Sequence, residues 1–537
     1  MPYMENRQNP ETKYIFVTGG VASSLGKGVA AASIGALLKA RGFSVHARKL
    51  DPYLNIDPGV MSPLQHGEVY VTDDGFETDL DLGYYERFLD TKLSKNDSVS
   101  GGRIYWEILN AERRGEYLGA TIQMIPHVTD HTKKYIKGDG PAADFVIIEI
   151  GGTVGDIEGL TFLEAARQFA NDVGRRHAMF IHLTLAPYLE AANELKTKPT
   201  QQSMRILLEK GIQADMFIVR AARALEDDER KKIGLYCNVA PANVISGPNM
   251  DNIYKIPLGF EAQGVADRVL EHFGLDSRAP DLSKFQKISD YLAADVPTVE
   301  IAMVGKYFQV DDAYKSLNEA LFHAGFANNV RVKIRKIDSE DLEKMSASEI
   351  ADAFRGARGI LVPGGFGSRG IEGKIAAVKF ARENNIPYFG ICLGMQIATI
   401  EFMRNVCGVK DAHSAEFSNS GTHIINIMPA HDKEDMGGTL RLGACPCVVK
   451  PGTLAHKIYG GDISERHRHR YELDIAHRDN LEKHGMIISG LSPDGRLPEI
   501  VEIPSHPFFI GVQFHPEFQS SPYNPHPVFK AFIAAGC

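Results

Sequence analysis

The sequence predicts an α/β protein made of two doubly wound domains. Strand-length apolar runs alternate with helical patterns, a glycine-rich turn directly follows the first run, and the whole pattern restarts after a polar stretch. The chain has 537 residues, of which 44% are hydrophobic and 24% are charged. This composition is typical of a globular protein and excludes a disordered, collagen-like or coiled-coil chain. The length allows two large α/β domains.

The first half contains the alternation that builds a parallel sheet. Lys13–Val17 is a predicted strand, Gly28–Arg41 a predicted helix and Ser44–Leu50 a second strand. Further apolar runs of strand length follow at Phe145–Ile150, Met179–Leu185 and Met216–Val219. Such continuous runs are typical of strands that are buried on both faces. Strands that alternate with helices indicate βαβ units with right-handed crossovers.

The pattern restarts after a polar, proline-containing stretch, residues 276–297, which we interpret as a linker. A helix is predicted beyond it at Asp312–Ala324. The predicted strands of this half are Val299–Val304, Val330–Ile337, Gly359–Val362 and Tyr388–Ile391. We therefore expect one domain over residues 1–275 and a second over residues 298–537, with the boundary uncertain by several residues.

Charge and cysteine content narrow the function classes. The formal net charge is −9, which disfavours a nucleic-acid-binding protein, because such proteins usually carry a basic excess. No apolar run approaches the ~18 residues that cross a membrane, and residues 1–13 lack the apolar core of an export signal. Six cysteines in a chain of this length do not form a disulfide framework. We expect a cytoplasmic protein with free thiols and no nucleic-acid or membrane partner.

A glycine-rich turn with the sequence GGVASSLGKG, residues 19–28, connects the first predicted strand to the first predicted helix. Backbone N–H groups in such a turn approach phosphate oxygens, and Lys27 adds a cation beside them. The spacing departs from the common phosphate loop, since Gly20 lies one residue too far from Gly26 and Gly28 replaces the usual Ser or Thr. We predict nucleotide binding at this turn; an ordinary strand-to-helix turn is the alternative.

Two acidic residues are candidate Mg²⁺ ligands, because this ion takes oxygen ligands and usually one or two carboxylates. Glu149 stands near the end of the apolar run FVIIEI, where an unpartnered charge is costly. Asp81 belongs to an acidic cluster, Asp73–Asp81, in which Asp79 is the other candidate. A buried salt bridge is the alternative for Glu149, and a solvated acidic loop is the alternative for the cluster.

Two further polar segments follow, and the basic one is a candidate anion contact. Asp156-Ile157-Glu158 follows a second glycine-rich turn, and the basic segment Lys196–Gln201 (KTKPTQ) precedes a helical pattern. Two lysines beside Pro and Thr suit an anion at a helix N-terminus. Many surface loops share this composition, so the basic segment alone is a weak signal.

The most specific local signal is a cysteine in a nucleophile elbow. The segment GICLGMQ, residues 390–396, follows a short predicted strand and precedes a helical pattern. It matches the G-x-S-x-G elbow with Cys in place of Ser, in which the glycines permit a sharp turn that exposes the nucleophile. Cys392 would then stand at a helix N-terminus, which favours the thiolate. The other five cysteines lack this setting, and Cys445 and Cys447 lack partners at zinc spacing.

A thiolate nucleophile needs a base and a group that orients the base. His515 and Glu517 follow the predicted strand Phe508–Phe514, and side chains two residues apart on an extended segment face the same way. His515 is therefore the candidate base and Glu517 its orienting carboxylate. The backbone N–H of Leu393 and the turn Pro363–Gly367 are candidate oxyanion donors.

Together these motifs resemble two known families. GGFG at residues 364–367, GICLGMQ and GVQFHPE resemble a class I glutamine amidotransferase domain, whereas GGVASSLGKG, EIGGTVGDIE and KTKPTQ resemble the P-loop-type synthetase domain of the CTP synthase family. The resemblance runs from Lys13 to Phe529 in the family's order, and it includes the departure in phosphate-loop spacing. It implies that ATP phosphorylates the 4-oxygen of UTP and that ammonia from glutamine hydrolysis replaces the phosphate.

The resemblance also implies residue roles. Cys392, His515 and Glu517 would form the catalytic triad, and Asp81 and Glu149 would bind the cofactor Mg²⁺. The implied ATP contacts are Ser24, Leu25, Gly26, Lys27, Gly28, Val29 and Asp81. The implied UTP and CTP contacts are Ser23, Asp156, Ile157, Glu158, Lys196, Thr197, Lys198, Pro199, Thr200, Gln201 and Lys232. The implied glutamine contacts are Gly365, Leu393, Gly394, Met395, Gln396, Glu416 and Arg470. Feedback inhibition by CTP, activation by GTP and a homotetramer are further implications.

Two other functions stay open at this point. One is an ATP-dependent amidotransferase–ligase of the cobyrinic acid type, which KTKPTQ and Asp156–Glu158 disfavour because they resemble UTP-site elements. The other is a non-catalytic, nucleotide-dependent assembly protein, which an intact set of Cys392, His515 and Glu517 disfavours. The run His467–Arg470 also lacks an assigned role beyond a glutamine contact of Arg470, and a surface basic run is the simplest interpretation of its first three residues.

Overall fold

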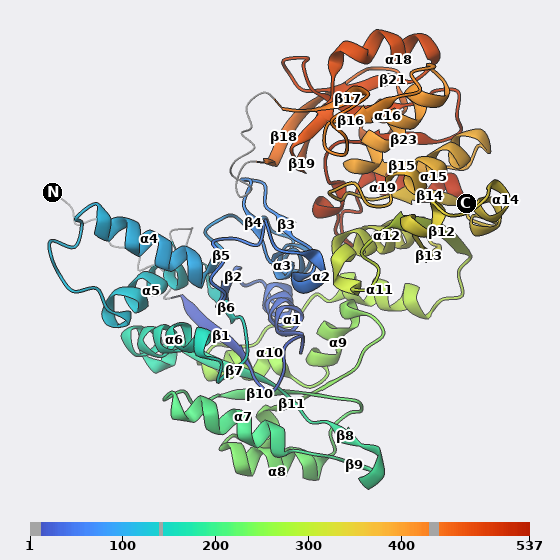
Figure 1. The fold of residues 1–537 in the computed structure, drawn as a ribbon. Helices are drawn as coiled ribbons and strands as arrows, with labels where there is room; N and C mark the ends of the chain where they lie inside the picture. Colours follow the sequence, from blue (N-terminus) through green and yellow to red (C-terminus); the bar gives the residue numbers. More distant parts are fainter. Residues whose placement is uncertain (1–11, 139–142, 429–439) are drawn as a thin grey trace, which may run out of the picture. The chain divides into compact units, whose positions relative to one another are not determined.

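The computed structural model describes residues 12–138, 143–428 and 440–537. Residues 1–11, on which most of the expectation about an export signal rests, lie outside this range. The chain divides into two compact units. The first unit comprises Met1–Asp57 and Asp81–Ala293, and the second comprises Pro58–Leu80 and Ala294–Cys537. Each unit is an α/β fold, which confirms the predicted fold class (Figure 1).

The first unit contains a seven-stranded sheet in which every pair of neighbouring strands is parallel. In spatial order the strands are β11 (Val244–Pro248), β10 (Met216–Ala221), β7 (Ala178–Leu185), β1 (Lys13–Gly19), β6 (Phe145–Ile150), β2 (Val45–Asp51) and β5 (Ser98–Ser100). The central strands are buried along nearly their whole length, as their continuous apolar runs predict. A short hairpin, β8 (Tyr188–Leu189) and β9 (Glu194–Leu195), follows β7.

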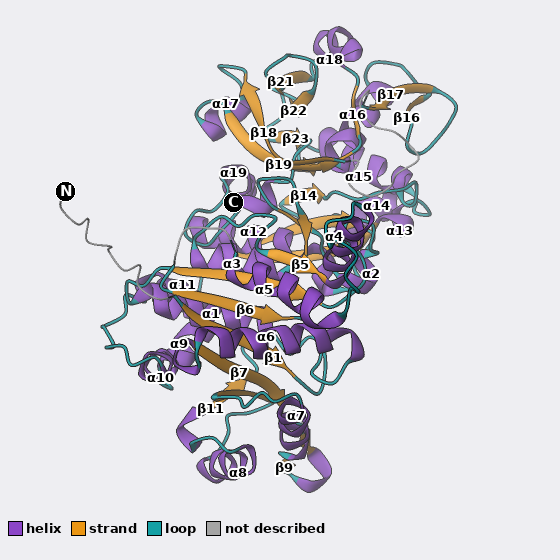
Figure 2. Cartoon of the chain, turned by 90° about the vertical axis from the view of Figure 1, so that its left-hand side faces the viewer, coloured by secondary structure: helices purple, strands orange, loops and turns teal. Residues whose placement is uncertain are grey.

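Helices cover both faces of this sheet (Figure 2). Val146 and Ile148 of β6 belong to the core on one face, whereas the side chain of Ile147 approaches Gly35 of α1 on the other. The helices are α1 (Lys27–Ala40), α3 (Asp81–Leu89), α4 (Gly101–Arg113), α5 (Thr129–Lys137), α6 (Leu160–Val173), α7 (Lys198–Glu209), α8 (Asp227–Cys237), α9 (Ile256–Glu261), α10 (Val265–His272) and α11 (Ser283–Ala293). The first unit is therefore doubly wound.

Helix α11 lies within the stretch that we interpreted as a linker. Its side chains Phe285, Ile288 and Tyr291 recur every three residues and are buried, which is the pattern of an amphipathic helix. The polar residues between them gave this stretch the composition of a linker.

The second unit contains a nine-stranded mixed sheet. Its parallel part is β13 (Arg331–Asp338), β12 (Thr298–Gly305), β14 (Gly359–Val362), β15 (Tyr388–Ile391) and β23 (Phe509–Val512). An antiparallel part continues from β23 through β22 (Pro498–Glu502), β21 (Ile487–Leu491), β18 (Arg441–Val449) and β19 (Ile463–His469). A small sheet adds β16 (Ala412–Ser414), β17 (Thr422–Ile427) and β20 (Tyr471–Leu473).

Helices also pack on both faces of the second unit's sheet, where they form two separate cores. They are α2 (Pro63–His66), α12 (Lys315–Asn328), α13 (Ser339–Leu342), α14 (Ala347–Ala353), α15 (Ile371–Glu383), α16 (Leu393–Asn405), α17 (Leu454–Tyr459), α18 (Arg478–His484) and α19 (Pro527–Gly536). No helix in the described ranges of either unit is both long and apolar enough to span a bilayer.

The segment Pro58–Leu80 packs into the second unit although it lies early in the sequence. It carries a hairpin of β3 (Tyr70–Val71) and β4 (Glu77–Thr78). The hydroxyl of Tyr70 donates to the carbonyl of Phe518 at 2.8 Å, and the backbone N–H of Ser316 donates to Glu68 Oε2 at 3.0 Å. These contacts join residues several hundred positions apart, so no local sequence pattern predicts them.

The core of the second unit makes a stability prediction. Phe389 of β15 is fully buried, with its ring 5.1 Å from that of Phe529 and 5.7 Å from that of Phe532. Phe389→Ala should lower the free energy of unfolding by about 3–5 kcal/mol, because it leaves a cavity in a close-packed core. Urea unfolding followed by circular dichroism measures this loss. Leu235→Ala, at a residue that is 80% exposed, is the control and should change little; an equal effect of both substitutions would contradict the assigned packing.

Candidate active sites

The predicted phosphate loop is present between β1 and α1. Val21, Ser24 and Gly26 all have positive φ angles, so the backbone turns sharply before the helix begins. Lys27 is the first residue of α1, and its Nζ donates to the carbonyl of Gly152 at 2.8 Å. A Cβ at Gly19 would lie 2.7 Å from the Lys27 side chain. The lysine side chain is therefore folded back over the turn.

The second glycine-rich turn lies directly beside this loop. It follows β6, and the backbone N–H of Val154 donates to the carbonyl of Gly19 at 2.8 Å. Asp156 Oδ2 accepts from the backbone N–H of Thr153 at 3.1 Å, which closes the turn. Asp156, Ile157 and Glu158 are exposed at its tip, where a ligand can reach them.

Helix α7, which begins inside the basic segment, packs against the same loop. The ring of His182 on β7 joins Thr18 Oγ1 at 2.8 Å to Ser203 Oγ of α7 at 2.7 Å. A Cβ at Gly20 would overlap Ser203 Oγ, which explains the glycine. The structure thus brings Lys196–Gln201 to the edge of the sheet where the two glycine-rich turns lie. Lys232, in contrast, lies on the exposed surface of α8, which packs on α7.

A buried ion cluster stands behind the phosphate loop. Lys49 Nζ lies 2.9 Å from Glu149 Oε1, 3.7 Å from Asp51 Oδ1 and within hydrogen-bond distance of Asp81. Tyr85 donates its hydroxyl to the second oxygen of Glu149. The ion pair confirms the salt bridge that we considered for Glu149. Sequence reasoning missed Lys49 and Asp51, because β2 shows only a strand pattern there.

The same cluster explains the departure from the common phosphate loop. A Cβ at Gly28 would lie 2.0 Å from Asp81 Oδ1, so the carboxylate occupies the space that a Ser or Thr side chain would fill. Burial raises the pKa of Asp51 to about 6, and Lys49 opposes this shift. Asp51 Oδ2 is buried without a hydrogen-bond partner.

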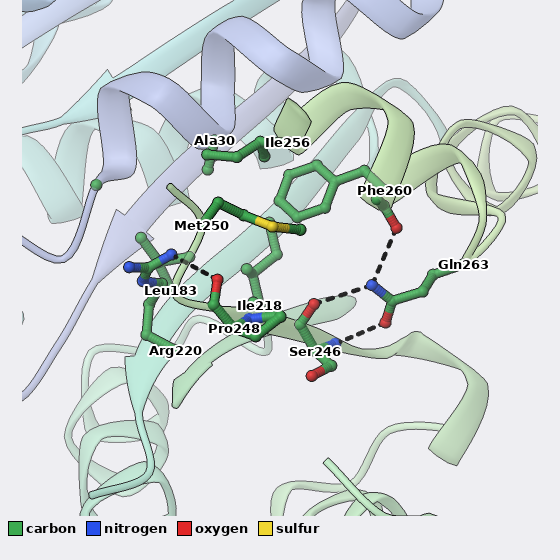
Figure 3. Close-up of a pocket in the computed structure, with 13 residues that line it drawn as sticks. Ala30, Leu183, Ile218, Arg220, Ser246, Pro248, Met250, Ile256, Phe260 and Gln263 are labelled. Atoms are coloured by element: carbon green, nitrogen blue, oxygen red, sulfur yellow. Dashed lines mark hydrogen bonds between the residues drawn. The ribbon is translucent and has the colours of Figure 1, made fainter. Parts of the chain in front are cut away.

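A small pocket opens beside the phosphate loop in the first unit (Figure 3). Gln263 fixes one wall, since its Nε2 donates to the carbonyl of Ser246 at 2.9 Å and its Oε1 accepts from the N–H of Ser246 at 2.8 Å. The lining is mostly apolar and comprises Gly26, Ala30, Leu183, Ile218, Arg220, Ser246, Gly247, Pro248, Met250, Ile256, Gly259, Phe260 and Gln263. An apolar slot beside a phosphate loop suits a flat aromatic base. Apart from Gly26, which belongs to GGVASSLGKG, these residues lie in no motif that the sequence analysis identified.

The predicted nucleophile elbow is present in the second unit. Cys392 follows β15 and caps α16 with φ 50° and ψ −103°, a strained conformation for a non-glycine residue. A Cβ at Gly390 would lie 2.6 Å from the backbone of Gly394, and one at Gly394 would lie 2.1 Å from the carbonyl of Val362. Only glycine fits at either position, so the spacing G-x-C-x-G has a steric cause.

The predicted base and its orienting carboxylate lie beside the elbow. His515 Nδ1 lies 2.7 Å from Glu517 Oε1, and both side chains are buried. Burial alone would lower the pKa of His515, but the charge of Glu517 and the interactions with Cys392 outweigh it and raise the pKa to about 10. His515 is therefore protonated at neutral pH, which leaves its Nε2 able to donate a proton.

The glycine turn Gly364–Gly367 completes this site. A Cβ at Gly364 would lie 2.7 Å from the His515 ring and 3.6 Å from the Cβ of Cys392, so the turn contacts both. Lys306, at the end of β12, donates to the carbonyls of Phe366 at 2.6 Å and Gly367 at 3.1 Å. Sequence reasoning missed this lysine.

A cavity of about 530 Å³ opens at the elbow. Of the predicted glutamine contacts, Gly365, Glu416 and Arg470 line it together with Cys392, His515 and Glu517. Burial raises the pKa of Glu416, whose Oε1 accepts from the backbone N–H of Gly367 at 2.7 Å. Leu393, Gly394, Met395 and Gln396 form the first turn of α16 and are buried.

Two interpretations of charged segments are wrong. His467 and His469 are 0% and 2% exposed on β19, so the run from His467 is not a surface basic run. The acidic cluster is not a solvated loop, because Asp73 pairs with Arg466 and Glu77 Oε1 lies 2.8 Å from Arg468 Nε. Asp79 lies in the second unit, 3.4 Å from His66 Nε2, whereas Asp81 joins the Lys49 cluster of the first unit. These pairings come from tertiary contacts that the local pattern does not encode.

Comparisons with known proteins agree with this architecture. The model of the CTP synthase N-terminus matches residues 13–275, and that of the class I glutamine amidotransferases matches residues 309–535. The chain is 55% identical to a CTP synthase of Paramagnetospirillum magneticum over 98% of both chains. It is 55% identical to a CTP synthase of Zymomonas mobilis over 97% of this chain and 98% of that one.

Among solved structures, the glutaminase domain of Trypanosoma brucei CTPS with bound acivicin is 46% identical. The match covers 44% of this chain and 93% of that one, with a TM-score of 0.42. The two family matches cover both units, and the curated relatives match over nearly the full length of the chain. The chain therefore belongs to the CTP synthase family.

Proposed function

We propose that the chain converts UTP to CTP with ATP and with ammonia taken from glutamine. The observation that carries this proposal is the presence, in one chain, of a phosphate loop with a buried lysine–carboxylate cluster and of a thiol elbow with its His–Glu pair. Relatives that match over the full length are CTP synthases, which does not favour a cobyrinic-acid-type ligase or a non-catalytic assembly protein.

The first unit would bind ATP through the residues around the phosphate loop. The base would enter the pocket beside Ala30 and Phe260, and the phosphates would meet the backbone of residues 24–29 and the ammonium of Lys27. Burial lowers the pKa of Lys27, and the negative charge of Glu149 opposes this shift.

The carboxylates of the Lys49 cluster fit a divalent cation. Asp81 and Glu149 would provide oxygen ligands beside the loop. Asp51 Oδ2 is buried without a hydrogen-bond partner, and a cation at this place would satisfy it. Within the described ranges no three His, Cys, Asp or Glu side chains converge as a complete site. Mg²⁺ keeps several waters and would take further oxygens from phosphate. When bound, Mg²⁺ would neutralise charge on the transferring phosphoryl group.

UTP would bind at the same edge of the sheet, along Ser23 and Lys196–Gln201, with Lys232 contributing from α8. The hydrogen bonds from His182 to Thr18 and Ser203 support this binding site, because they hold α7 against the phosphate loop. The bond from O4 of UTP to the γ-phosphorus would form as the bond to ADP breaks and N3 of the pyrimidine loses its proton. Ammonia would then attack C4, phosphate would leave with the bonding pair, and the added nitrogen would give one proton to the departing phosphate. CTP would inhibit by contacting Asp156, Ile157 and Glu158.

The second unit would hydrolyse glutamine. The Cys392 thiolate attacks the amide carbon, and the π electron pair moves to oxygen, which the N–H groups of Leu393 and the Gly364–Gly367 turn stabilise. The C–N bond breaks as the nitrogen takes a proton from His515, which releases ammonia and leaves a thioester. Water attacks the thioester and gives a proton to His515, the C–S bond breaks, and the sulfur recovers its electron pair. Glu416 and Arg470 would bind the charged end of glutamine.

A cytoplasmic location, a homotetramer and activation by GTP belong to the same proposal. The homotetramer and the activation by GTP rest on the family alone. The cytoplasmic location also agrees with the six cysteines, which are all free.

Cys392→Ala should lower glutamine-dependent CTP formation at least about a thousandfold, because the nucleophile is lost. Synthesis from added ammonium should stay within about twofold of the unsubstituted protein. A coupled CTP assay with each nitrogen donor measures both rates. Cys407→Ala is the matched control, since this half-buried thiol lies outside the site. Retained glutamine use in the Cys392 variant would remove the thiol from its role.

Lys27→Met should lower CTP formation about a hundredfold or more with either nitrogen donor, because ATP phosphorylates UTP before ammonia attacks it. Steady-state rates with glutamine and with ammonium chloride measure the effect. Lys231→Met, at a lysine whose side chain is 67% exposed, controls for the loss of a positive charge. A Lys27 variant with a normal ammonium-supported rate would contradict the phosphate-loop assignment.

Glu149→Gln keeps the shape of the side chain and removes its charge. It should raise the Mg²⁺ concentration for half-maximal turnover about tenfold, since a ligand charge is lost. A magnesium titration of ammonium-supported CTP formation measures this change, and a thermal melt run in parallel reports folding. A lowered melting temperature with an unchanged magnesium dependence would show that Glu149 serves only the ion pair with Lys49.

A further inference from the structure

The side chain of Gln513 reaches the sulfur atom of Cys392. Gln513 follows β23, which pairs in parallel with β15 so that Val512 stands opposite Ile391, the residue before Cys392. Its side chain is fully buried, and its Nε2 lies 3.6 Å from Cys392 Sγ, a hydrogen-bond distance for the larger sulfur atom. Its backbone N–H donates to the carbonyl of Glu499 at 2.8 Å, which fixes the residue in the sheet.

The surrounding hydrogen bonds determine which end of this amide faces the sulfur. Gln396 on α16 approaches the backbone carbonyl of Tyr471 at 2.8 Å, and a carbonyl can only accept, so Gln396 must present its NH₂ group there. The same NH₂ group lies 3.2 Å from the side chain of Gln513, which must present its oxygen in return. The NH₂ group of Gln513 therefore points at Cys392.

An amide donor has a defined use at a thiolate. Hydrogen bonds to a charged acceptor are about twice as strong as those between neutral groups, and they strengthen in a buried site. His515 supplies the other favourable partner, but it gives up its proton when ammonia leaves. When water later breaks the C–S bond, the electron pair returns to the sulfur, and the Gln513 N–H is already in place to receive the growing charge.

We propose that Gln513 is a catalytic residue that donates a hydrogen bond to the Cys392 thiolate, and that Gln396 is the positioning residue that orients it. This inference rests on the proposed role of Cys392. Both NH₂ hydrogens of Gln396 are used within the protein, one by the Tyr471 carbonyl and one by the Gln513 oxygen, so the amide of Gln513 is held in one orientation.

The test measures how fast iodoacetamide alkylates Cys392 in the full-length protein at fixed pH. Peptide mass spectrometry reads the labelling, with the exposed Cys537 as an internal reference. Gln513→Met fills similar space without a donor and should slow alkylation of Cys392 about tenfold. Gln513→Glu keeps the shape but turns an oxygen toward the sulfur, so it should be slower still. Gln519→Glu is the matched control, because Gln519 donates to the carbonyl of Ser464 instead, and it should react as the unsubstituted protein does.

A double-substitution cycle tests the role of Gln396. Gln396→Met should slow alkylation less than Gln513→Met, and the double variant should be no slower than Gln513→Met alone, because both act through one hydrogen bond. Additive effects would overturn the positioning role of Gln396.

Two outcomes separate this inference from the role of Cys392 itself. Alkylation of Gln513→Met within about twofold of the unsubstituted rate would overturn the inference, even where Cys392→Ala abolishes glutamine use. Retained glutamine use by Cys392→Ala would instead overturn the proposed nucleophile. Ammonium-supported CTP formation and a thermal melt report folding of each variant, and if the buried glutamate of Gln513→Glu prevents folding, Gln513→Met decides alone.

Discussion

Parallel strands end at a common edge of their sheet, and both candidate sites are built on that constraint. In the first unit the ends of β1, β6 and β2 carry the phosphate loop, the second glycine turn and Asp51. In the second unit the ends of β12, β14, β15 and β23 carry Lys306, the Gly364 turn, Cys392 and the segment from Gln513 to Glu517. Residues far apart in sequence thus meet because their strands are neighbours in register. A substitution that shifts one of these strands would displace a reacting group even though it touches none.

Each site places charge where water is scarce. Lys49 is held between buried carboxylates, and His515 between Glu517 and a thiol, so each charged group has a partner of opposite sign. Unpaired, such groups would cost several kcal/mol each. The net charge of −9 says nothing about this arrangement, because the anionic ligands would be met by a few local cations and backbone N–H groups.

The sequence predicts those features that a short segment encodes by itself. The predicted strands and the two sharp strand-to-helix turns at residues 19–28 and 390–396 are present, because apolar runs and glycine spacing act locally. Strands β5 and β11 and the antiparallel strands β18, β19, β21 and β22 were not predicted. The sequence analysis did not predict the roles of Lys49, Lys306 and Gln513. Each is a single polar residue in a strand or at its end, and its role depends on tertiary neighbours that the local sequence does not show. The same reason explains why Asp73 and Glu77 looked like a solvated loop and why His467 looked exposed. Segment Pro58–Leu80 joins the second unit through contacts several hundred residues away, which no local pattern records.

The central claim is that nitrogen freed from glutamine in the second unit enters the pyrimidine made in the first. The most direct measurement supplies ATP, UTP, Mg²⁺ and glutamine with heavy nitrogen in its side-chain amide, in a solution that also contains a small excess of unlabelled ammonium. Mass spectrometry then reads the isotope in the product. The account predicts CTP that carries the heavy nitrogen in its 4-amino group. Absence of CTP, or CTP that carries only the unlabelled nitrogen, would contradict it.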